Sequence, residues 1–304
     1  MQVDRSKIFI GMGGWDLEPF DRVFYPPGTK RGFRKLEYYS QFFDSVEIHS
    51  SFYSSALTPI HAHRWLQDIA ANKHFLFSSV KLFRGFTHTG TADQGDVLAT
   101  HRLLEPLAAA NRLGGLLMQF PYSFTNIRER RLYLMELARA FQPYRLFVEV
   151  RHNSWNSPMM YNFFQENKLH LVNIDVPAVG RAMPLTDAAW NGVAYFRLMG
   201  RNAATVWDPT RGYRSDYCYN DRELQDLAWR LKRAEQSSGT VHVSFNNDGG
   251  ACSFMNGFQL RHLLRSRHPV LVPDRLVKAF PVLQPISTPV NILHPLFSSH
   301  PEER

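Results

Sequence analysis

Residues 146–155, LFVEVRHNSW, begin as a buried strand and end in charged side chains. Aliphatic and aromatic residues dominate the first half, as they do in the interior of a sheet. Glu149 and Arg151 nevertheless alternate with valines, and His152 follows directly. Charged side chains are costly to bury unless they are paired. The stretch therefore predicts a strand whose carboxyl end enters a place where charged groups meet partners.

The same strand pattern occurs eight times along the chain. Each run is rich in apolar, β-branched or aromatic residues and is short enough to form one strand. The runs lie at residues 8–15, 45–52, 75–81, 114–120, 146–151, 170–175, 193–200 and 240–248. Strands that alternate with helical patterns indicate βαβ units and a parallel sheet.

Helix start signals separate most of these runs. They are Thr58-Pro59, Ser157-Pro158 and two capping-box pairs, Asn126 with Glu129 and Asn220 with Glu223. A further helix is expected at about residues 254–264. Between the sixth and seventh runs only LTDAAW, at residues 185–190, is available, and we expect a short turn of helix there.

Eight such units in about 265 residues have the size of a closed (β/α)8 barrel. An open doubly wound sheet is the alternative. GMGG at residues 11–14 lacks the dinucleotide-binding pattern G-x-G-x-x-G, because Asp16 occupies the position of the last glycine. We therefore predict an α/β fold, a single-domain (β/α)8 TIM barrel at residues 1–267.

Residues 268–304 have a different character, with seven prolines among apolar residues. Proline at this density excludes a long helix. We expect a Pro-rich extended C-terminal tail that packs along the outside of the barrel or is partly disordered.

Composition limits the setting and the partners. The net charge of +8 and the pI of about 9.6 favour anionic partners, either phosphorylated metabolites or nucleic acid. The dense basic patches at residues 29–35, 128–131 and 261–268 resemble helices, where such charge usually forms a solvated face. No apolar run approaches the roughly 20 residues of a membrane helix, and the start of the chain lacks a secretory pattern. Because the two cysteines have no metal or redox spacing, we expect a reducing, cytoplasmic setting.

Polar residues, together with Trp15 and Met199, stand near the ends of the strand runs, where TIM barrels carry their active sites. They are Trp15, Glu47, His49, Ser79, Lys81, Gln119, Glu149, Arg151, His152, Asn173, Asp175, Arg197, Met199, Asn246, Asn247 and Asp248. Four pairs are two residues apart and so share a face of their strand: Glu47/His49, Ser79/Lys81, Glu149/Arg151 and Asn173/Asp175. Because helices cover the outer face, we expect all four pairs to face the interior. The structural alternative is a layer of ion pairs that closes the top of the barrel.

These residues also carry a resemblance to the family called domain of unknown function 72, or YecE-like. The matching segments are IGMGGW, VEIHSSFY, VKLFRGFTH, GGLLMQFPYSF, VEVRHNSW, DVP, FRLMG and FNNDGG, which span about residues 8–260. The resemblance implies a (β/α)8 barrel and supplies no established reaction. By position it implies site residues at Trp15, Glu47, Lys81, His88, Gln119, Glu149, Arg151, His152, Trp155, Asp175, Arg197 and Asn246.

The chain departs from this family pattern at three places. His49 stands where the family usually has Asn, and Met199 where it commonly has His. Met12-Gly13 stands where Thr-Ser is common. If the family shares one reaction, these departures imply altered substrate contacts or a weakened activity.

The first functional hypothesis is a metal-independent enzyme of hydrolase or lyase type that acts on an anionic, phosphorylated or sugar-containing small substrate. Glu47 and Glu149 would divide acid and base roles if their surroundings separate their pKa values. Lys81, Arg151 and Arg197 would hold a phosphate or carboxylate. A variant of this hypothesis makes Lys81 a Schiff-base nucleophile, provided that burial lowers its pKa.

The predicted site divides into two groups. The catalytic candidates are Glu47, Lys81, Glu149, Arg151 and Asp175. Trp15 and Trp155 would stack on a sugar or base. The other substrate-binding candidates are His49, His88, Gln119, His152, Arg197, Asn246, Asn247 and Asp248.

Two alternatives stay open. A metal-dependent phosphoesterase or nuclease would use ligands among His49, His88, Glu47, Glu149, His152, Asp175 and Asp248. The cations expected in the same mouth would repel a divalent metal, so we predict no metal ligands and no cofactor. A non-catalytic nucleic-acid binder agrees with the basic pI and the aromatic residues, but no recognition motif supports it.

Overall fold

A computed structural model describes residues 7–29, 31–205 and 216–290 of the chain. Its strands are β1 Ile8–Met12, β2 Ser45–Ile48, β3 Leu76–Lys81, β4 Leu116–Gln119, β5 Leu146–Glu149, β6 Leu169–Leu171, β7 Asn173–Asp175, β8 Val193–Leu198, β9 Thr240–Phe245, β10 Val270–Pro273 and β11 Ser287–Val290. Its α-helices are α1 Glu18–Val23, α2 Lys35–Tyr39, α3 Ser50–Tyr53, α4 Pro59–Asp68, α5 Gln94–Ala109, α6 Arg128–Ala140, α7 Pro158–Glu166, α8 Asp221–Ser238, α9 Cys252–Leu264 and α10 Asp274–Ala279. Shorter helical turns are η1 Gly85–Thr89, η2 Asn153–Trp155, η3 Ala203–Thr205, η4 Gly249–Ala251 and η5 Pro281–Ile286.

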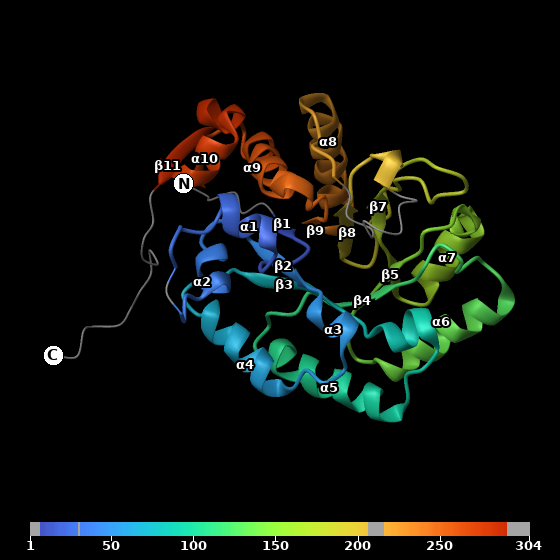
Figure 1. Cartoon of the computed structure of the whole chain (residues 1–304). Helices are drawn as coiled ribbons and strands as arrows, with labels where there is room; N and C mark the ends of the chain where they lie inside the picture. Colours follow the sequence, from blue (N-terminus) through green and yellow to red (C-terminus); the bar gives the residue numbers. More distant parts are fainter. Residues whose placement is uncertain (1–6, 30, 206–215, 291–304) are drawn as a thin grey trace.

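The strands β1 to β9 form one parallel sheet in the order β6-β5-β4-β3-β2-β1-β9-β8-β7. β6 and β7 are two halves of one chain segment, separated only by Val172. β6 pairs with β5 and β7 pairs with β8, so this segment links the two ends of the order. The segment closes a TIM-barrel-like α/β fold, and the eight predicted runs all contribute strands. Figure 1 shows the helices arranged around these strands.

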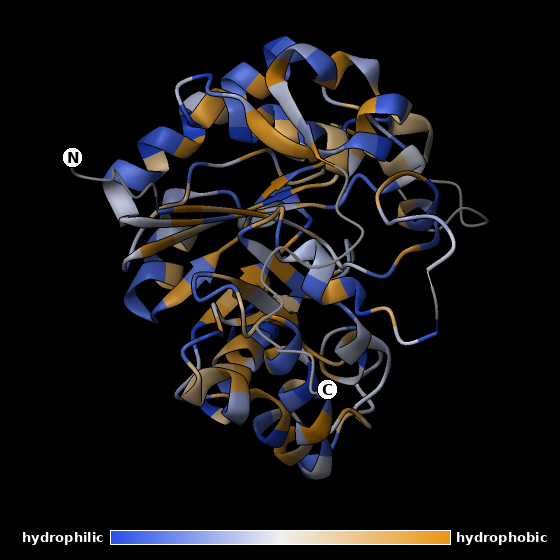
Figure 2. Cartoon of the chain, turned by 90° about the vertical axis from the view of Figure 1, so that its left-hand side faces the viewer, coloured by the Kyte–Doolittle hydropathy of each residue, from blue (hydrophilic) through white to orange (hydrophobic). Residues whose placement is uncertain are grey.

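Side chains fill the barrel interior below the mouth. Phe147 of β5 packs against Tyr195 of β8, with ring centroids 4.8 Å apart, and Tyr195 lies 5.9 Å from His242 of β9. All three are buried. In Figure 2 the central strands carry many hydrophobic residues, whereas the surrounding helices alternate hydrophobic and hydrophilic segments. This packed layer forms the floor on which the polar groups of the mouth lie.

The predicted helix starts have mixed outcomes. Thr58 caps α4, and the Ser157 side chain accepts a hydrogen bond from the backbone N–H of Met160 at the start of α7. Asn220 and Glu223 form the expected capping box of α8. The predicted capping box at Asn126 is wrong. Its side chain donates to the Ser154 carbonyl and accepts from Arg131, so it links η2 to the first turn of α6 instead.

Two connections also differ from the prediction. No helix forms in residues 176–192 between β7 and β8, because this segment runs as a loop. Residues 270–290 are not simply extended: they hold β10, α10, η5 and β11, and β10 pairs in parallel with β11. These short elements pack on α9 and α1. Residues 291–304 of the predicted tail lie outside the described part.

Cys218 and Cys252 form a disulfide, with Cα atoms 5.2 Å apart across a sequence separation of 34. The spacing of the two cysteines, from which we expect a reducing setting, does not predict this link. The Asn256 side chain bonds to the backbone N–H and C=O of Tyr219, which brings the segment before α8 against the start of α9. Sequence spacing gives no sign of that contact. None of the described helices is long and apolar enough to cross a membrane.

Candidate functional site

A cavity of about 720 Å³ opens at the carboxyl ends of the strands. Nine of the predicted site residues line it: Trp15, His49, Lys81, His88, Gln119, Arg151, Arg197, Asn246 and Asp248. They come from β1, β2, β3, β4, β5, β8, β9 and the loops that follow. The structure therefore gathers distant parts of the sequence at one mouth, in the place where TIM barrels hold their active sites.

Glu47 of β2 lies at the centre of a buried network. Both of its oxygens accept from Arg197 of β8, at 2.8 Å from Nε and 2.7 Å from Nη2. The Tyr195 hydroxyl also donates to Glu47, and His49 contacts the same carboxylate. Glu47 is fully buried, so this bidentate pair with a neighbouring hydroxyl provides the compensation that its charge requires.

Arg197 extends the network to a second carboxylate. Its Nη1 pairs with Glu149 of β5, and its Nη2 donates to Asn246 Oδ1 at 3.0 Å. Arg151 Nε donates to the other oxygen of Glu149 at 2.9 Å. Two acids and two arginines from three strands thus form one layer. The structure thus contains the ion-pair layer that was the structural alternative, and the cavity lies beside this layer.

The two carboxylates have pKa values below the ordinary range. Burial alone would raise the pKa of Glu47, but Arg197 and His49 outweigh it and hold the value well below normal. For Glu149, burial is again outweighed, here by Arg197, Arg151 and Lys81, and the pKa is lowered. Both groups are therefore ionised at neutral pH. A division of acid and base roles requires surroundings that raise the pKa of one carboxyl and lower that of the other. Here the surroundings lower both pKa values.

At Lys81, the last residue of β3, the surroundings destabilise the charged form, whereas they stabilise the charged forms of the two carboxylates. Burial and the nearby Arg197 lower its pKa to about 7, although Glu149 and Glu47 act against the shift. Its Nζ lies 3.9 Å from the centroid of the Phe52 ring. Within the described residues no carboxylate oxygen lies within 4.0 Å of that nitrogen. An amine with a pKa near neutrality exchanges protons readily at physiological pH.

Two histidines border the same cavity. Burial, Lys81, Arg151 and Arg84 lower the pKa of His88 to about 4, so its ring is neutral at pH 7. Its Nδ1 lies 2.8 Å from the Thr87 hydroxyl, and its ring packs edge-on against Phe52 at 5.0 Å. Burial also lowers the pKa of His49 despite the opposing effect of Glu47.

Six predicted site residues do not line the cavity. Glu47 and Glu149 lie in the ion-pair layer beside it. Trp155 is fully buried and donates to the Phe124 carbonyl, so it packs the fold. His152 Nδ1 bonds to Ser154, and Asn247 donates to the Tyr217 carbonyl and to Asn256. These contacts hold loops in place. The sixth is Asp175.

Asp175 is turned away from the mouth. It pairs with Arg201, whose other end binds Glu223 on the outer helix α8. Asn173, two residues earlier, bonds to the backbone of Ala188 in the loop outside the sheet. The expectation that all four pairs face the interior is thus wrong for Asn173/Asp175. The other three pairs face inward, since Ser79 bonds to Tyr195 at 3.0 Å while Glu47 and Glu149 meet at Arg197.

Sequence reasoning missed several residues of the cavity. Phe52 and Arg84 line the cavity, and Gly13 allows the His49 and Asn246 side chains to approach the backbone. A Cβ at Gly13 would lie 2.8 Å from His49 Cε1 and would also overlap the Asn246 amide. Tyr195, which belongs to the buried network with Glu47 and not to the cavity wall, was also missed, because it lies inside an aromatic core strand. Arg84 lies in the segment VKLFRGFTH, and its position just after β3 was the available signal.

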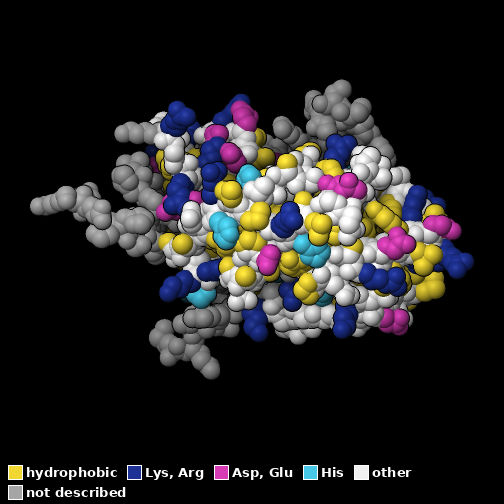
Figure 3. All heavy atoms as spheres, turned by 90° about the horizontal axis from the view of Figure 1, so that it is seen from below, with side chains coloured by type: hydrophobic (Ala, Val, Ile, Leu, Met, Phe, Trp, Pro, Cys, Tyr) yellow, Lys and Arg dark blue, Asp and Glu magenta, His cyan; other side chains and the backbone are white. Residues whose placement is uncertain are grey.

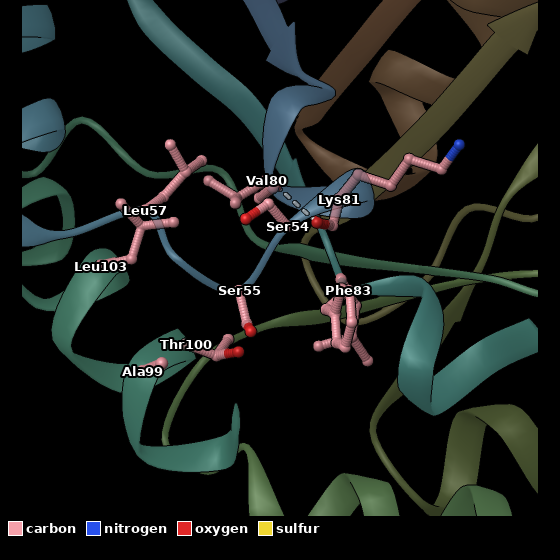
Figure 4. A pocket seen from close by; sticks show the side chains of 11 residues that line it. Ser54, Ser55, Leu57, Val80, Lys81, Phe83, Ala99, Thr100 and Leu103 are labelled. Carbon is pink, nitrogen blue, oxygen red and sulfur yellow. Dashed lines mark hydrogen bonds between the residues drawn. The ribbon is translucent and has the colours of Figure 1, made fainter. Parts of the chain in front are cut away.

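A much smaller pocket, about 10 Å³, lies on the other side of the β3 end. Figure 4 shows Ser55, Thr100 and Leu103 around it and the Lys81 side chain pointing away from them. The Ser51 hydroxyl donates to the Lys81 carbonyl at 2.6 Å, which fixes the backbone there. Lys81 thus reaches the large cavity with its side chain and borders the small pocket with its backbone.

The donor set of the described residues does not resemble a metal centre. Within residues 7–29, 31–205 and 216–290, no three His, Cys, Asp or Glu side chains are grouped so that they could hold a metal ion. The carboxylates best placed at the mouth already bind arginines. We therefore derive no step through a metal.

Comparison with known proteins gives one consistent assignment. The family model described as "Protein of unknown function DUF72" matches residues 9–279. The UPF0759 protein YunF of Bacillus subtilis (strain 168) is 30% identical over 288 residues, which cover 88% of this chain and 99% of that protein.

Solved structures agree. A DUF72 family protein from Thermotoga maritima has a TM-score of 0.75 at 28% identity and covers 85% of this chain and 99% of its own. A DUF72 family protein from Enterococcus faecalis V583 has a TM-score of 0.75 at 26% identity, with 85% and 95% covered. The chain belongs to the DUF72 family, whose function is unknown.

Proposed function

We propose that this protein is a metal-independent enzyme of hydrolase or lyase type that binds a small anionic substrate in the barrel mouth. The observation that carries the proposal is Lys81, a nearly buried amine with a pKa of about 7 that faces a cavity of about 720 Å³. Such a pKa is suited to proton transfer near neutrality, and it costs stability to maintain.

The charges around the cavity support an anionic substrate. Lys81, Arg84, Arg151 and Arg197 are among its lining residues, against Asp16 and Asp248. Asp16 is paired with Lys35, which reduces its influence. Arginine and lysine side chains recognise carboxylate and phosphate groups, arginine through its planar fork. A cavity of this size accommodates a metabolite-sized molecule.

In this proposal the buried carboxylates act as supports. Glu47 and Glu149 hold Arg197 in the floor of the mouth, and Glu149 also orients Arg151. They stay ionised while Lys81 changes its protonation. Lys81 is the reactive amine of the site, and Glu47 and Glu149 position the cations that fix the substrate.

The proposal is tested first by anion binding. Binding of inorganic phosphate is measured by calorimetry for the wild type, Arg84→Met and the control Lys73→Met, which alters an exposed lysine away from the cavity. We expect Arg84→Met to weaken binding by about fivefold or more and Lys73→Met to leave it unchanged. Equal affinity in all three proteins would contradict an anion site at the mouth.

Turnover is the second test. A panel of phosphorylated and carboxylated metabolites is screened with the wild type, and any compound that reacts is tested with Lys81→Met. We expect the rate to fall at least about a hundredfold, the size of a typical acid–base contribution. A turned-over compound that Lys81→Met consumes at the wild-type rate would remove Lys81 from the mechanism.

The nucleic-acid alternative has less support in the described residues. On the face shown in Figure 3, Lys and Arg side chains are scattered among acidic, hydrophobic and other residues. A phosphate-tracking surface needs a continuous basic stripe. Tight binding of a single-stranded oligonucleotide that weakens steeply as salt rises would favour this alternative.

A further inference from the structure

Lys81 is held where its amine can reach a bound molecule. It is the last residue of β3, and its carbonyl accepts from the Ser51 hydroxyl at 2.6 Å. The next residue, Leu82, donates its N–H to Leu117 of β4 at 2.9 Å. With the backbone fixed on both sides, the side chain extends into the large cavity and away from the small pocket (Figure 4).

The surroundings of the amine favour a neutral nucleophile over an ion pair. Glu47 and Glu149, the nearest buried carboxylates, are engaged by Arg197 and Arg151 instead. The described contact of Lys81 Nζ is the face of the Phe52 ring at 3.9 Å, which supplies no proton acceptor. Desolvation next to other cations is the arrangement that activates a lysine as a nucleophile. The lowered pKa of Lys81 agrees with this geometry.

We propose that Lys81 Nζ forms an imine with the carbonyl group of an aldehyde or ketone substrate that also bears a carboxylate or phosphate. This inference rests on the proposed function and names the substrate class of the same site. The nitrogen lone pair attacks the carbonyl carbon, and the carbonyl oxygen takes up a proton. The tetrahedral adduct then loses water as nitrogen gives up its protons, so that C=O and NH₂ become C=N and H₂O. No oxidant or reductant is required.

The cavity carries groups for the rest of such a substrate. Arg84 is exposed at the cavity wall and has no ion pair with any described residue, so it is available to an anionic group. Trp15 offers an aromatic wall. His88 is neutral at pH 7 and contacts the same Phe52 ring as Lys81. It therefore lies near the amine without adding a positive charge to those of Arg151 and Arg197.

Reductive trapping tests the proposal on the intact chain. The wild-type protein is incubated with glyoxylate, a small anionic aldehyde, and sodium cyanoborohydride at pH 7, and labelled lysines are mapped by mass spectrometry. We expect Lys81 to be labelled more than about tenfold faster than the exposed Lys73, because an ordinary lysine is almost entirely protonated at that pH. Labelling at Lys81 no faster than at Lys73 overturns the proposal.

Two further arms separate its failure from that of the proposed function. Propionaldehyde, which lacks the anionic group, should label Lys81 at least about fivefold more slowly than glyoxylate relative to Lys73. Equal relative rates overturn the anionic part of the substrate class. If phosphate binds with the expected Arg84 dependence while Lys81 resists labelling, the imine is excluded and the anion site stands. Because trapping is performed on the wild type, no variant has to fold.

Discussion

Lys81 makes a specific prediction about stability and pH. Its pKa is about 7 in the folded protein, compared with an ordinary value near 10.5. The unfolded chain therefore binds more protons between these values, so this lysine makes stability rise with pH across roughly pH 7 to 10. Below pH 7 both states are protonated and the cost of burying the charge is constant.

We expect Lys81→Met to increase the free energy of unfolding at pH 6 by about 2–4 kcal/mol. The difference from the wild type should shrink as the pH rises toward 10. Urea denaturation at several pH values measures both effects. The exposed Lys73→Met serves as the control and should change stability by less than about 0.5 kcal/mol. A variant less stable than the wild type at pH 6 would show that burying the charged amine of Lys81 does not lower the stability of the protein.

Gly13 and His49 form a second residue-scale case. The resemblance to the family implies Ser and Asn at these positions, and a Cβ at Gly13 would overlap Asn246 Oδ1 and would lie 2.8 Å from His49 Cε1. The small residue therefore makes room for both the Asn246 amide and the His49 ring. The two positions, which the sequence presents as separate, lie side by side in the structure.

We expect Gly13→Ser to cost about 1–3 kcal/mol of stability through overpacking. His49→Asn in the same chain should recover part of this loss, with a coupling energy above about 0.5 kcal/mol. The single variant His49→Asn completes the double-mutant cycle. Strictly additive effects in thermal or urea unfolding would indicate that the contact with Asn246 alone limits the space at Gly13.

At the scale of elements, Arg197 of β8 joins β2 and β5 across the barrel through Glu47 and Glu149. Removing one partner of a buried ion network leaves uncompensated charge, which usually costs more than the network contributes to stability. We expect Arg197→Met to lower the free energy of unfolding by about 3–5 kcal/mol. Arg230→Met, which breaks the exposed pairs of α8 with Asp187 and Asp226, should cost no more than about 1 kcal/mol.

Chemical denaturation of the two arginine variants decides this prediction. Similar losses for both would mean that the buried layer contributes no more than a surface pair. The triple variant Glu47→Gln, Glu149→Gln, Arg197→Met tests the reason, because neutralising these three buried charges together should cost less than removing Arg197 alone.

The elements also show what local sequence can predict. The eight strand runs were found because buried parallel strands are continuously apolar. Asn220 and Asn126 have the same capping-box signal, yet only Asn220 caps a helix, because Ser154 and Arg131 engage Asn126. The inward pairs Glu47/His49 and Glu149/Arg151 followed from strand alternation. Asn173/Asp175 did not, since the alternation fixes a shared face but not which face is inside.

For the whole molecule, the barrel and most of the mouth could be predicted because topology alone brings strand ends together. An ion-pair layer could be considered from the sequence, but its pairs could not be identified, because partners such as Glu47 and Arg197 lie about 150 residues apart. The directions of the pKa shifts of Glu47 and Glu149 depend on the same partners, so they could not be predicted from the sequence either. The same holds for the contact between the two cysteines, which comes from packing of the α8 and α9 starts.

The disulfide makes the last prediction, at this scale. Cys218–Cys252 links the segment before α8 to α9 across 34 residues, and Asp248, at the cavity wall, lies four residues before Cys252. Closing a loop of this length restricts the unfolded chain, which corresponds to at most about 4 kcal/mol of stability. We expect purified, unreduced protein to show no free thiol after denaturation, and Cys218→Ser/Cys252→Ser to unfold at lower urea concentration. Reduction should lower the wild-type midpoint and leave the double variant unchanged. Two titratable thiols in protein purified without reductant, with equal midpoints for both proteins, would show that the cysteines are unlinked, and the reducing setting suggested by their spacing would stand.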